Sequence, residues 1–172
     1  GLTAKVQILN MDGSVAWEKE ATVDSNEDTT NKCIKLAFPV NLSKVHFIKM
    51  VLTENGKVVS DNFYHRSLEE NNYQDLRQLA KVALQSTTTV DKHADGTWSA
   101  VSVIENKTST PALMIRLNVV GNKDGQQLLP VFYSDNYFSL LPGEKKEVRM
   151  SWKDEDTRGN EGKVLITGYN VE

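Results

Sequence analysis

Short runs in which hydrophobic and polar residues alternate recur along the chain, and a period of two is typical of half-buried β-strands. The run 44–53 alternates in this way as far as an Asn55-Gly56 pair. Such pairs favour tight hairpin turns because they tolerate positive φ. Asp12-Gly13, Asp95-Gly96 and Asp124-Gly125 separate other runs rich in Val, Ile, Thr and aromatic residues in the same manner. The pattern predicts an all-β fold.

The predicted strands fall into two groups. About five lie in residues 1–67, and about seven lie beyond residue 80. Seven is the number of strands in an immunoglobulin-like sandwich of about a hundred residues. We therefore expect two tandem immunoglobulin-like β-sandwiches, in residues 1–67 and 85–172. The expected strands are approximately 3–10, 14–22, 31–38, 44–53 and 57–65 in the first group, and 81–90, 98–106, 112–120, 127–133, 136–140, 145–152 and 162–170 in the second.

Residues 68–84 form the expected linker between the two sandwiches. Apolar residues within it, among them Leu76 and Leu79, recur at helical spacing after Asp75, which is suited to capping a first turn. We expect a single helical turn in which Leu76 and Leu79 fill the domain junction. A full amphipathic helix is the alternative, but short helices rarely persist without packing.

The first sandwich is expected to be incomplete at its N-terminus. Residues 1–65 supply about five strands where a complete sandwich has about seven, and strand-like alternation is already under way at Leu2. Missing strands leave unpaired edges and part of an apolar face uncovered, and both invite pairing with another chain. We expect the first sandwich to be less stable than residues 86–172 and able to self-associate through its exposed edges.

Charge and composition narrow the classes of function. The 172 residues carry a net charge of −3, without the basic stripe that nucleic-acid binding requires. No apolar run approaches the roughly 20 residues that span a bilayer. Cys33 is the single cysteine, which excludes an internal disulfide, and it is expected to be a small buried residue. Nucleic-acid and membrane partners are therefore not expected.

No pattern in the chain predicts a cofactor or a metal. The three histidines lie on separate segments, whereas a metal site needs three or four convergent ligands. The four acids of residues 153–163 follow a connection that is typical of a solvated loop. Among the tryptophans, Trp17 and Trp152 are expected to face a core, Trp17 beside Val15. Trp98 is the one candidate for an exposed sugar-stacking ring.

The stretch 133–144, YSDNYFSLLPGE, is the densest group of polar and aromatic residues. Asp135 and Asn136 carry side-chain oxygens that can accept hydrogen bonds from turn amides, and the Pro-Gly pair at 142–143 favours a reversal of the chain. Tyr133 and Tyr137 flank this turn at the junction of two predicted strands. We interpret the stretch first as a corner of the scaffold.

Four segments together carry a resemblance to a known family. They are LTAKVQILNMDGSVAWEKEA, NGKVVSDNFYH, YQDLRQLAKVAL and LLPVFYSDNYFSLLPGEKKEV. With these segments the whole chain resembles the C-terminal pair of β-sandwiches of glycoside hydrolase family 2, in its β-mannosidase and exo-β-glucosaminidase branch.

The resemblance implies that catalysis takes place in another domain of the parent protein. In that family the catalytic residues lie on a TIM barrel, and a barrel of about 250 residues does not fit in this chain. The chain would then be a non-catalytic, cofactor-free accessory part of a retaining exo-β-glycosidase that is periplasmic or secreted. Its partners would be the barrel of the same parent chain and, through it, a carbohydrate substrate. Tyr133, Asp135, Asn136 and Tyr137 would be a loop at the pocket rim or at the interface with the barrel.

Two other functions remain open on the sequence. A free-standing carbohydrate-binding module would bind sugar through Trp98. A cell-surface spacer built from immunoglobulin-like units would have no barrel at all. The sequence leaves open which sugar the parent enzyme would cleave.

Overall fold

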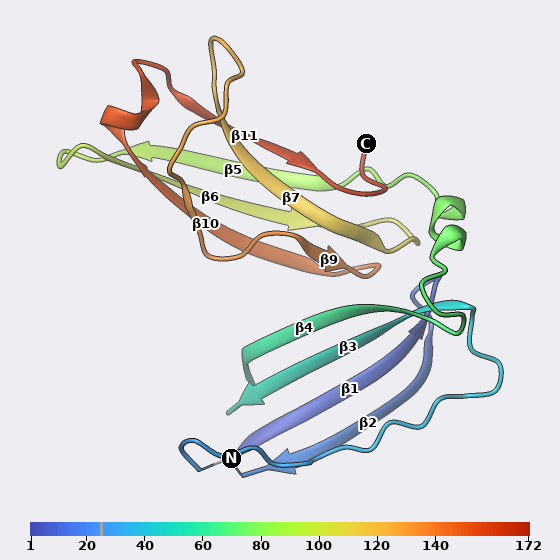
Figure 1. Ribbon diagram of the computed structural model, residues 1–172. Coiled ribbons are helices and arrows are strands. Elements are labelled where there is room, and N and C mark those ends of the chain that lie inside the picture. The colour runs from blue at the N-terminus through green and yellow to red at the C-terminus, as the bar shows by residue number, and fades with distance from the viewer. Residues whose placement is uncertain (25) are drawn as a thin grey trace. The chain divides into compact units, whose positions relative to one another are not determined.

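The computed structural model describes residues 1–24 and 26–172. The chain divides into two compact units, residues 1–79 and 80–172, and each is described by itself. Both units are built from antiparallel strands (Figure 1).

The first unit contains one sheet of four strands in the order β2-β1-β3-β4. Each neighbouring pair is antiparallel. The β3–β4 hairpin turns at Asn55-Gly56, where both residues have positive φ, 49° and 77°, as a type I′ turn requires. The strands are β1 (Leu2–Asn10), β2 (Val15–Val23), β3 (Val45–Glu54) and β4 (Lys57–Ser67).

The register of this sheet places apolar side chains on both of its faces. Ile8 lies opposite Ile48, and Leu9 lies opposite Phe47, so the two pairs point to opposite faces because side chains alternate along a strand. The Phe47 ring centroid lies 5.1 Å from that of Phe63. The buried apolar residues of the sheet and its connections are Val6, Ile8, Leu9, Leu42, Val45, Phe47 and Ile48.

The strand expected at 31–38 is not present. These residues have no regular secondary structure, and Cys33, which we expected to be buried, is exposed. Phe38 is 49% exposed and contacts the buried His46 ring edge-on. Alternation alone does not make a strand, because a strand needs a neighbour whose backbone completes the ladder. In the part of the chain that the structure describes, this segment pairs with neither edge of the sheet.

The expectation that Trp17 and Val15 share a face is also wrong. The register of β1 with β2 shifts between Ile8 and Leu9, so that Trp17 lies opposite Ile8 and Val15 lies opposite Leu9. Such a bulge adds one residue to a strand and reverses the facing of the residues beyond it. Trp17 is half-buried on the Ile8 face, whereas Val15 is 51% exposed.

The second unit contains two sheets. One has four strands in the order β5-β6-β10-β8, and the other has three in the order β11-β7-β9. The four-stranded sheet consists of β5 (Gln85–Lys92), β6 (Thr97–Glu105), β10 (Lys145–Lys153) and β8 (Phe132–Tyr133). The other consists of β7 (Ala112–Gly121), β9 (Phe138–Leu140) and β11 (Gly162–Thr167). The short η2 (Asp154–Thr157) follows β10.

The core of the second unit lies between these sheets. Val148, Met150 and Trp152 alternate inward along β10, each at most 2% exposed, which confirms the inward placement of Trp152. Gly162 lies so close to Trp152 that a Cβ there would be 2.7 Å from the indole ring, so this position requires glycine. The buried cluster comprises Val82, Ala100, Ile104, Ala112, Ile115, Leu117, Val119, Leu128, Phe138, Leu140, Val148, Met150 and Trp152.

The chain segment that connects β4 to β5 contains one short 3₁₀ helix, η1 (Gln74–Gln78). This is the single turn expected there, and Leu76 within it is buried. Val82 lies in the expected linker, but it is fully buried in the second core and bridges to Val171. The second unit accordingly begins at Ala80.

Candidate functional site

Residues 133–144, here called the corner, are joined to the middle of β7 by hydrogen bonds of Asn136. Its Oδ1 accepts a hydrogen bond from the Leu117 backbone N–H at 2.8 Å, and its Nδ2 donates to the Leu117 carbonyl at 3.0 Å. This pair of bonds reproduces what a neighbouring strand would supply. β9 pairs with β7 only at Ala112 and Ile115, so the Asn136 amide takes over where that ladder ends.

Tyr133 forms a similar hydrogen bond with β7, two residues further along the strand, at Val119. Its hydroxyl oxygen accepts a hydrogen bond from the Val119 backbone N–H at 3.2 Å. Burial raises the pKa of the Tyr133 phenol above its ordinary value, so the hydroxyl stays neutral and keeps its own proton. Along β7, the amides of Leu117 and Val119 are thus satisfied by side chains of the corner.

Asp135 orders the turn itself. Its Oδ1 accepts a hydrogen bond from the Asn136 backbone N–H at 2.7 Å, and its Oδ2 pairs with the Lys146 ammonium. The same ammonium lies 5.1 Å from the centroid of the Phe138 ring. These contacts hold the Asp135 carboxylate as a structural acceptor.

Tyr137 is the one residue of the four whose side chain points outward. It is 65% exposed and has a positive φ of 59°, which is uncommon for a residue with a bulky side chain. The Arg116 guanidinium lies 5.9 Å from the centroid of its ring. The structure therefore brings the four predicted residues together. Three of them form polar contacts within the unit, whereas Tyr137 is exposed.

The corner does not contain the elements of acid–base catalysis. Glycosidases use two carboxyl groups that flank the scissile bond. Asp135 is paired with Lys146, and the Glu144 carboxylate accepts a hydrogen bond from the Leu141 N–H at 2.9 Å. No cluster of His, Cys, Asp or Glu that could hold a metal occurs among residues 1–24 and 26–172. Within the same residues, no helix is long and apolar enough to cross a membrane.

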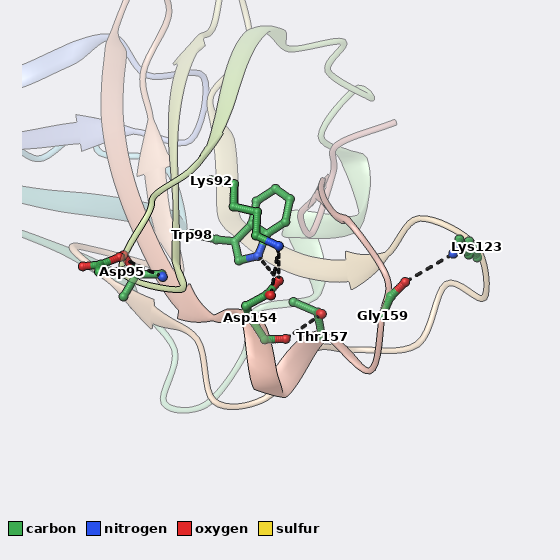
Figure 2. A network of polar contacts seen from close by, with 8 residues as sticks. Lys92, Asp95, Trp98, Lys123, Asp154, Thr157 and Gly159 are labelled. Atoms are coloured by element: carbon green, nitrogen blue, oxygen red, sulfur yellow. Dashed lines mark hydrogen bonds and ion pairs between the residues drawn. The ribbon is translucent and has the colours of Figure 1, made fainter.

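Trp98 is held in a polar network (Figure 2). Its Nε1–H donates to Asp154 Oδ1 at 2.8 Å, and the Lys92 ammonium bonds the same carboxylate at 2.9 Å. These two bonds, the one from Lys92 foremost, lower the pKa of Asp154 below its ordinary value. Asp95 caps the adjacent turn by accepting from the Thr97 N–H and hydroxyl.

The neighbours of Trp98 leave it no free face for sugar. In the register of the sheet, Trp98 lies between Lys92 on β5 and Trp152 on β10. The Trp152 ring is nearly parallel to it at 6.3 Å, and the Lys92 ammonium lies 5.2 Å from its centroid. Both flanks of the Trp98 ring are therefore occupied.

Phe132 is an exposed aromatic residue that the sequence analysis did not single out. It is 69% exposed and lies at a hollow of about 440 Å³ on the four-stranded sheet, with Ser99, Arg149 and Ser151 among the lining residues. The sequence does indicate that Phe132 is exposed, because successive side chains along a strand point to opposite faces. An inward Tyr133 implies an outward Phe132.

Comparison with known proteins gives the family. Residues 62–171 match the model described as "Exo-beta-D-glucosaminidase Ig-fold domain". An exo-β-D-glucosaminidase of Hypocrea jecorina is 31% identical over 98% of this chain and 21% of its own length. One of Streptomyces avermitilis is 30% identical over 99% of this chain and 22% of its own. The chain thus spans about a fifth of the length of these relatives.

Solved structures agree with the sequence comparison. The crystal structure of the Amycolatopsis orientalis exo-chitosanase matches this chain with a TM-score of 0.83 and 26% identity. The match covers 99% of this chain and 23% of the exo-chitosanase chain. A complex of a variant of that enzyme with PNP-β-D-glucosamine matches with a TM-score of 0.82. The all-β, immunoglobulin-like fold expected from the strand pattern is confirmed, and the family model matches residues 62–171. The chain belongs to the immunoglobulin-fold domain family of the exo-β-D-glucosaminidases.

Proposed function

We propose that this chain is the accessory portion of a retaining exo-β-glycosidase of the exo-β-glucosaminidase type, whose catalytic barrel lies elsewhere in the same parent protein. The observation that carries the proposal is the match of residues 62–171 to the glucosaminidase immunoglobulin-fold model. The relatives reported above favour a glucosaminidase over a β-mannosidase, since each is named for glucosamine or chitosan.

The state of the corner supports a non-catalytic role for this part of the protein. Asn136 and Tyr133 complete the backbone hydrogen bonding of β7, and Asp135 is neutralised by Lys146. A side chain whose bonding capacity is used in this way stabilises the scaffold and does not transfer protons. The purified 172-residue chain should not hydrolyse an aryl β-D-glucosaminide or an aryl β-D-mannoside, and measurable turnover of either would refute the proposal.

A finer role concerns Tyr137, which we assign to the interface with the catalytic barrel or to the rim of its pocket. Tyr137 is a large apolar side chain that is 65% exposed, as an interface residue would be in the absence of its partner surface. In the full-length parent enzyme, Tyr137→Ala should raise KM several-fold at constant kcat if the loop lines the pocket, or lower the melting temperature if it packs on the barrel. Tyr169→Ala is the matched control, because Tyr169 is also an exposed tyrosine of the second unit. An unchanged KM and melting temperature in Tyr137→Ala would refute both roles.

A second proposed interaction is self-association through the first unit. β2 and β4 are the outer strands of its only sheet in the described residues, and Val58 and Val59 on β4 are 61% and 51% exposed. Outer strands present unpaired backbone groups that template pairing with another chain. Light scattering of the 172-residue chain should show a concentration-dependent increase in mass that Val58→Lys suppresses. A strict monomer at high concentration would contradict this interaction but leave the accessory role intact.

A further inference from the structure

The hollow beside Phe132 lies on the outer face of the four-stranded sheet of the second unit. Ser151 on β10 lies opposite Ser99 on β6 and opposite Phe132 on β8, so the three side chains form a row on one face. Trp152 and Met150, their neighbours along β10, are buried in the core on the other face. We name this hollow the Phe132 groove. Its lining residues are Ser99, Ala100, Val101, Phe132, Tyr133, Ser134, Arg149, Met150 and Ser151.

The polar groups of the Phe132 groove are held in place and remain accessible. The Ser99 hydroxyl lies 2.8 Å from His93 Nε2. The Arg149 side chain is 72% exposed, and its Nη2 lies 2.7 Å from a Glu147 carboxylate oxygen. Ser151 is exposed, and its hydroxyl has no hydrogen-bond partner in the described part of the chain. The groove therefore offers hydroxyl and guanidinium groups beside one open aromatic face.

This combination fits a pyranose ring. A gluco-configured pyranose carries its hydroxyls around the ring edge and axial C–H bonds on its two faces, so a face can pack on an aromatic ring while the edge forms hydrogen bonds. Phe132 supplies the ring, and Ser99, Ser151 and Arg149 supply the polar groups at its edge. Sites for small ligands commonly combine an apolar surface with a few placed polar groups.

The charge of the groove selects among sugars. Arg149 is the one charged lining residue, and Glu147 neutralises it. A phosphorylated ligand or nucleic acid would need several unpaired cations. The ammonium group of an amino sugar would need an unpaired carboxylate, whereas the Glu147 carboxylate beside the groove is already paired with Arg149. The occupant expected on chemical grounds is an uncharged sugar.

We propose that the Phe132 groove is a carbohydrate-binding site for uncharged, gluco-configured pyranose units, such as glucosyl or N-acetylglucosaminyl residues of an oligosaccharide. Tyr137 is not among the residues that line this site, and the proposal does not depend on the proposed accessory role. Its affinity is weak, about millimolar, because one stacked ring buries little surface.

A nuclear magnetic resonance titration of the ¹⁵N-labelled 172-residue chain tests the proposal. The ligands are cellohexaose and N-acetylchitohexaose, with the cationic chitosan hexaose as the charged comparison. Both neutral sugars should shift the amides of Ser99, Phe132 and Ser151, and the cationic sugar should bind several-fold more weakly. No shift with either neutral sugar, shifts centred on Trp98, or equal binding of the cationic sugar would overturn the proposal.

Two variants and one control complete the test. Phe132→Ala should lower the affinity about tenfold or more, and its exposure means that folding should be retained. Arg149→Gln should lower it a few-fold by removing the guanidinium. Tyr169→Ala should bind as the parent chain does, because Tyr169 is exposed on the same unit but does not line the groove. Unchanged affinity in Phe132→Ala would also overturn the assignment.

Discussion

The two units differ in what covers their sheets. In the second unit a four-stranded and a three-stranded sheet enclose a core in which Val82, Ile104, Ile115 and Val148 are fully buried. In the first unit the described residues form a single four-stranded sheet. Its few buried apolar residues are divided between the two faces of the sheet, because Ile8 and Phe47 point to opposite sides.

The difference shows that alternation along a strand predicts a sheet but not what packs against it. Both units have the period of two, and both form antiparallel ladders. Among the described residues, only the second unit has a facing sheet to exclude water, and burial of apolar surface is the main stabilising contribution to folding. The first unit instead buries the polar imidazole of His46, which is 2% exposed.

The largest expected effect comes from a matched pair of cavity substitutions. Ile115→Ala in the second unit should lower the free energy of unfolding by about 4 kcal/mol, and Ile48→Ala in the first by about 2 kcal/mol. Ile115 is closed in between two sheets, whereas Ile48, on a single sheet and 6% exposed, leaves a cavity that can relax or admit water.

Amide hydrogen exchange resolved by residue measures each unit separately. The parent chain is the reference, and there the amides of residues 1–65 should exchange faster than those of residues 86–172. Equal losses in the two variants, together with equal protection in the parent chain, would remove the distinction between the units.

The next effect concerns the corner of the second unit. Asn136→Ala removes both hydrogen bonds to the Leu117 backbone. The Leu117 N–H and carbonyl then lose these partners, which should lower the free energy of unfolding by about 2–3 kcal/mol. Tyr137→Ala, one residue away but exposed, should change it by less than about 0.5 kcal/mol. Urea denaturation followed by tryptophan fluorescence compares the two. A similar small loss in both would mean that the corner does not depend on the Asn136 amide.

Much of the fold was predictable because local signals and tertiary structure agree. The Asn55-Gly56 turn needs positive φ at both positions, and these residues adopt it readily. Val148, Met150 and Trp152 alternate inward along β10, as their sequence pattern indicates. The segment 31–38 was not predictable in this way, because its pattern is strand-like but it pairs with no strand in the described part of the chain. The bulge between Ile8 and Leu9 also leaves no mark in the alternation.

The corner was predictable as a structural turn, but the partners of its residues were not. Asp135 and Asn136 are residue types that satisfy turn amides, so their structural role could be anticipated. The amide of Asn136 completes the edge of β7, at Leu117, and nineteen residues of sequence separate the two. Trp98 was expected to be exposed, but Lys92 and Trp152 flank it through cross-strand register, which sequence alone does not give.

A smaller effect should distinguish the units by pH. Burial lowers the pKa of His46 and of His65, both in the first unit, below the ordinary value of 6.5. The unfolded chain then binds protons that the folded chain does not. Stability is therefore complete above about pH 6.5 and falls as the pH drops below it, by at most about 1.4 kcal/mol per pH unit for each histidine.

Hydrogen exchange at about pH 7 and pH 5.5, corrected for intrinsic rates, measures this dependence in each unit. The first unit should lose about 1 kcal/mol more than the second. His46→Phe combined with His65→Phe should reduce the difference, and His93→Gln in the second unit is the control. An identical pH dependence in both units of the parent chain would show that the buried histidines do not destabilise the first unit in acid.

The smallest expected effect on stability is at Cys33. The side chain is exposed on a segment without regular structure, so Cys33→Ser should change the free energy of unfolding by less than about 0.5 kcal/mol. For the same reason a thiol reagent should label Cys33 in the folded chain at nearly the rate found in urea. A cysteine introduced at Ala100, which is 1% exposed in the second core, is the matched control and should react only on unfolding. Slow labelling of Cys33 in the folded chain would mean that residues 31–38 are covered after all, and the contrast between the two units would then be smaller than their sheets indicate.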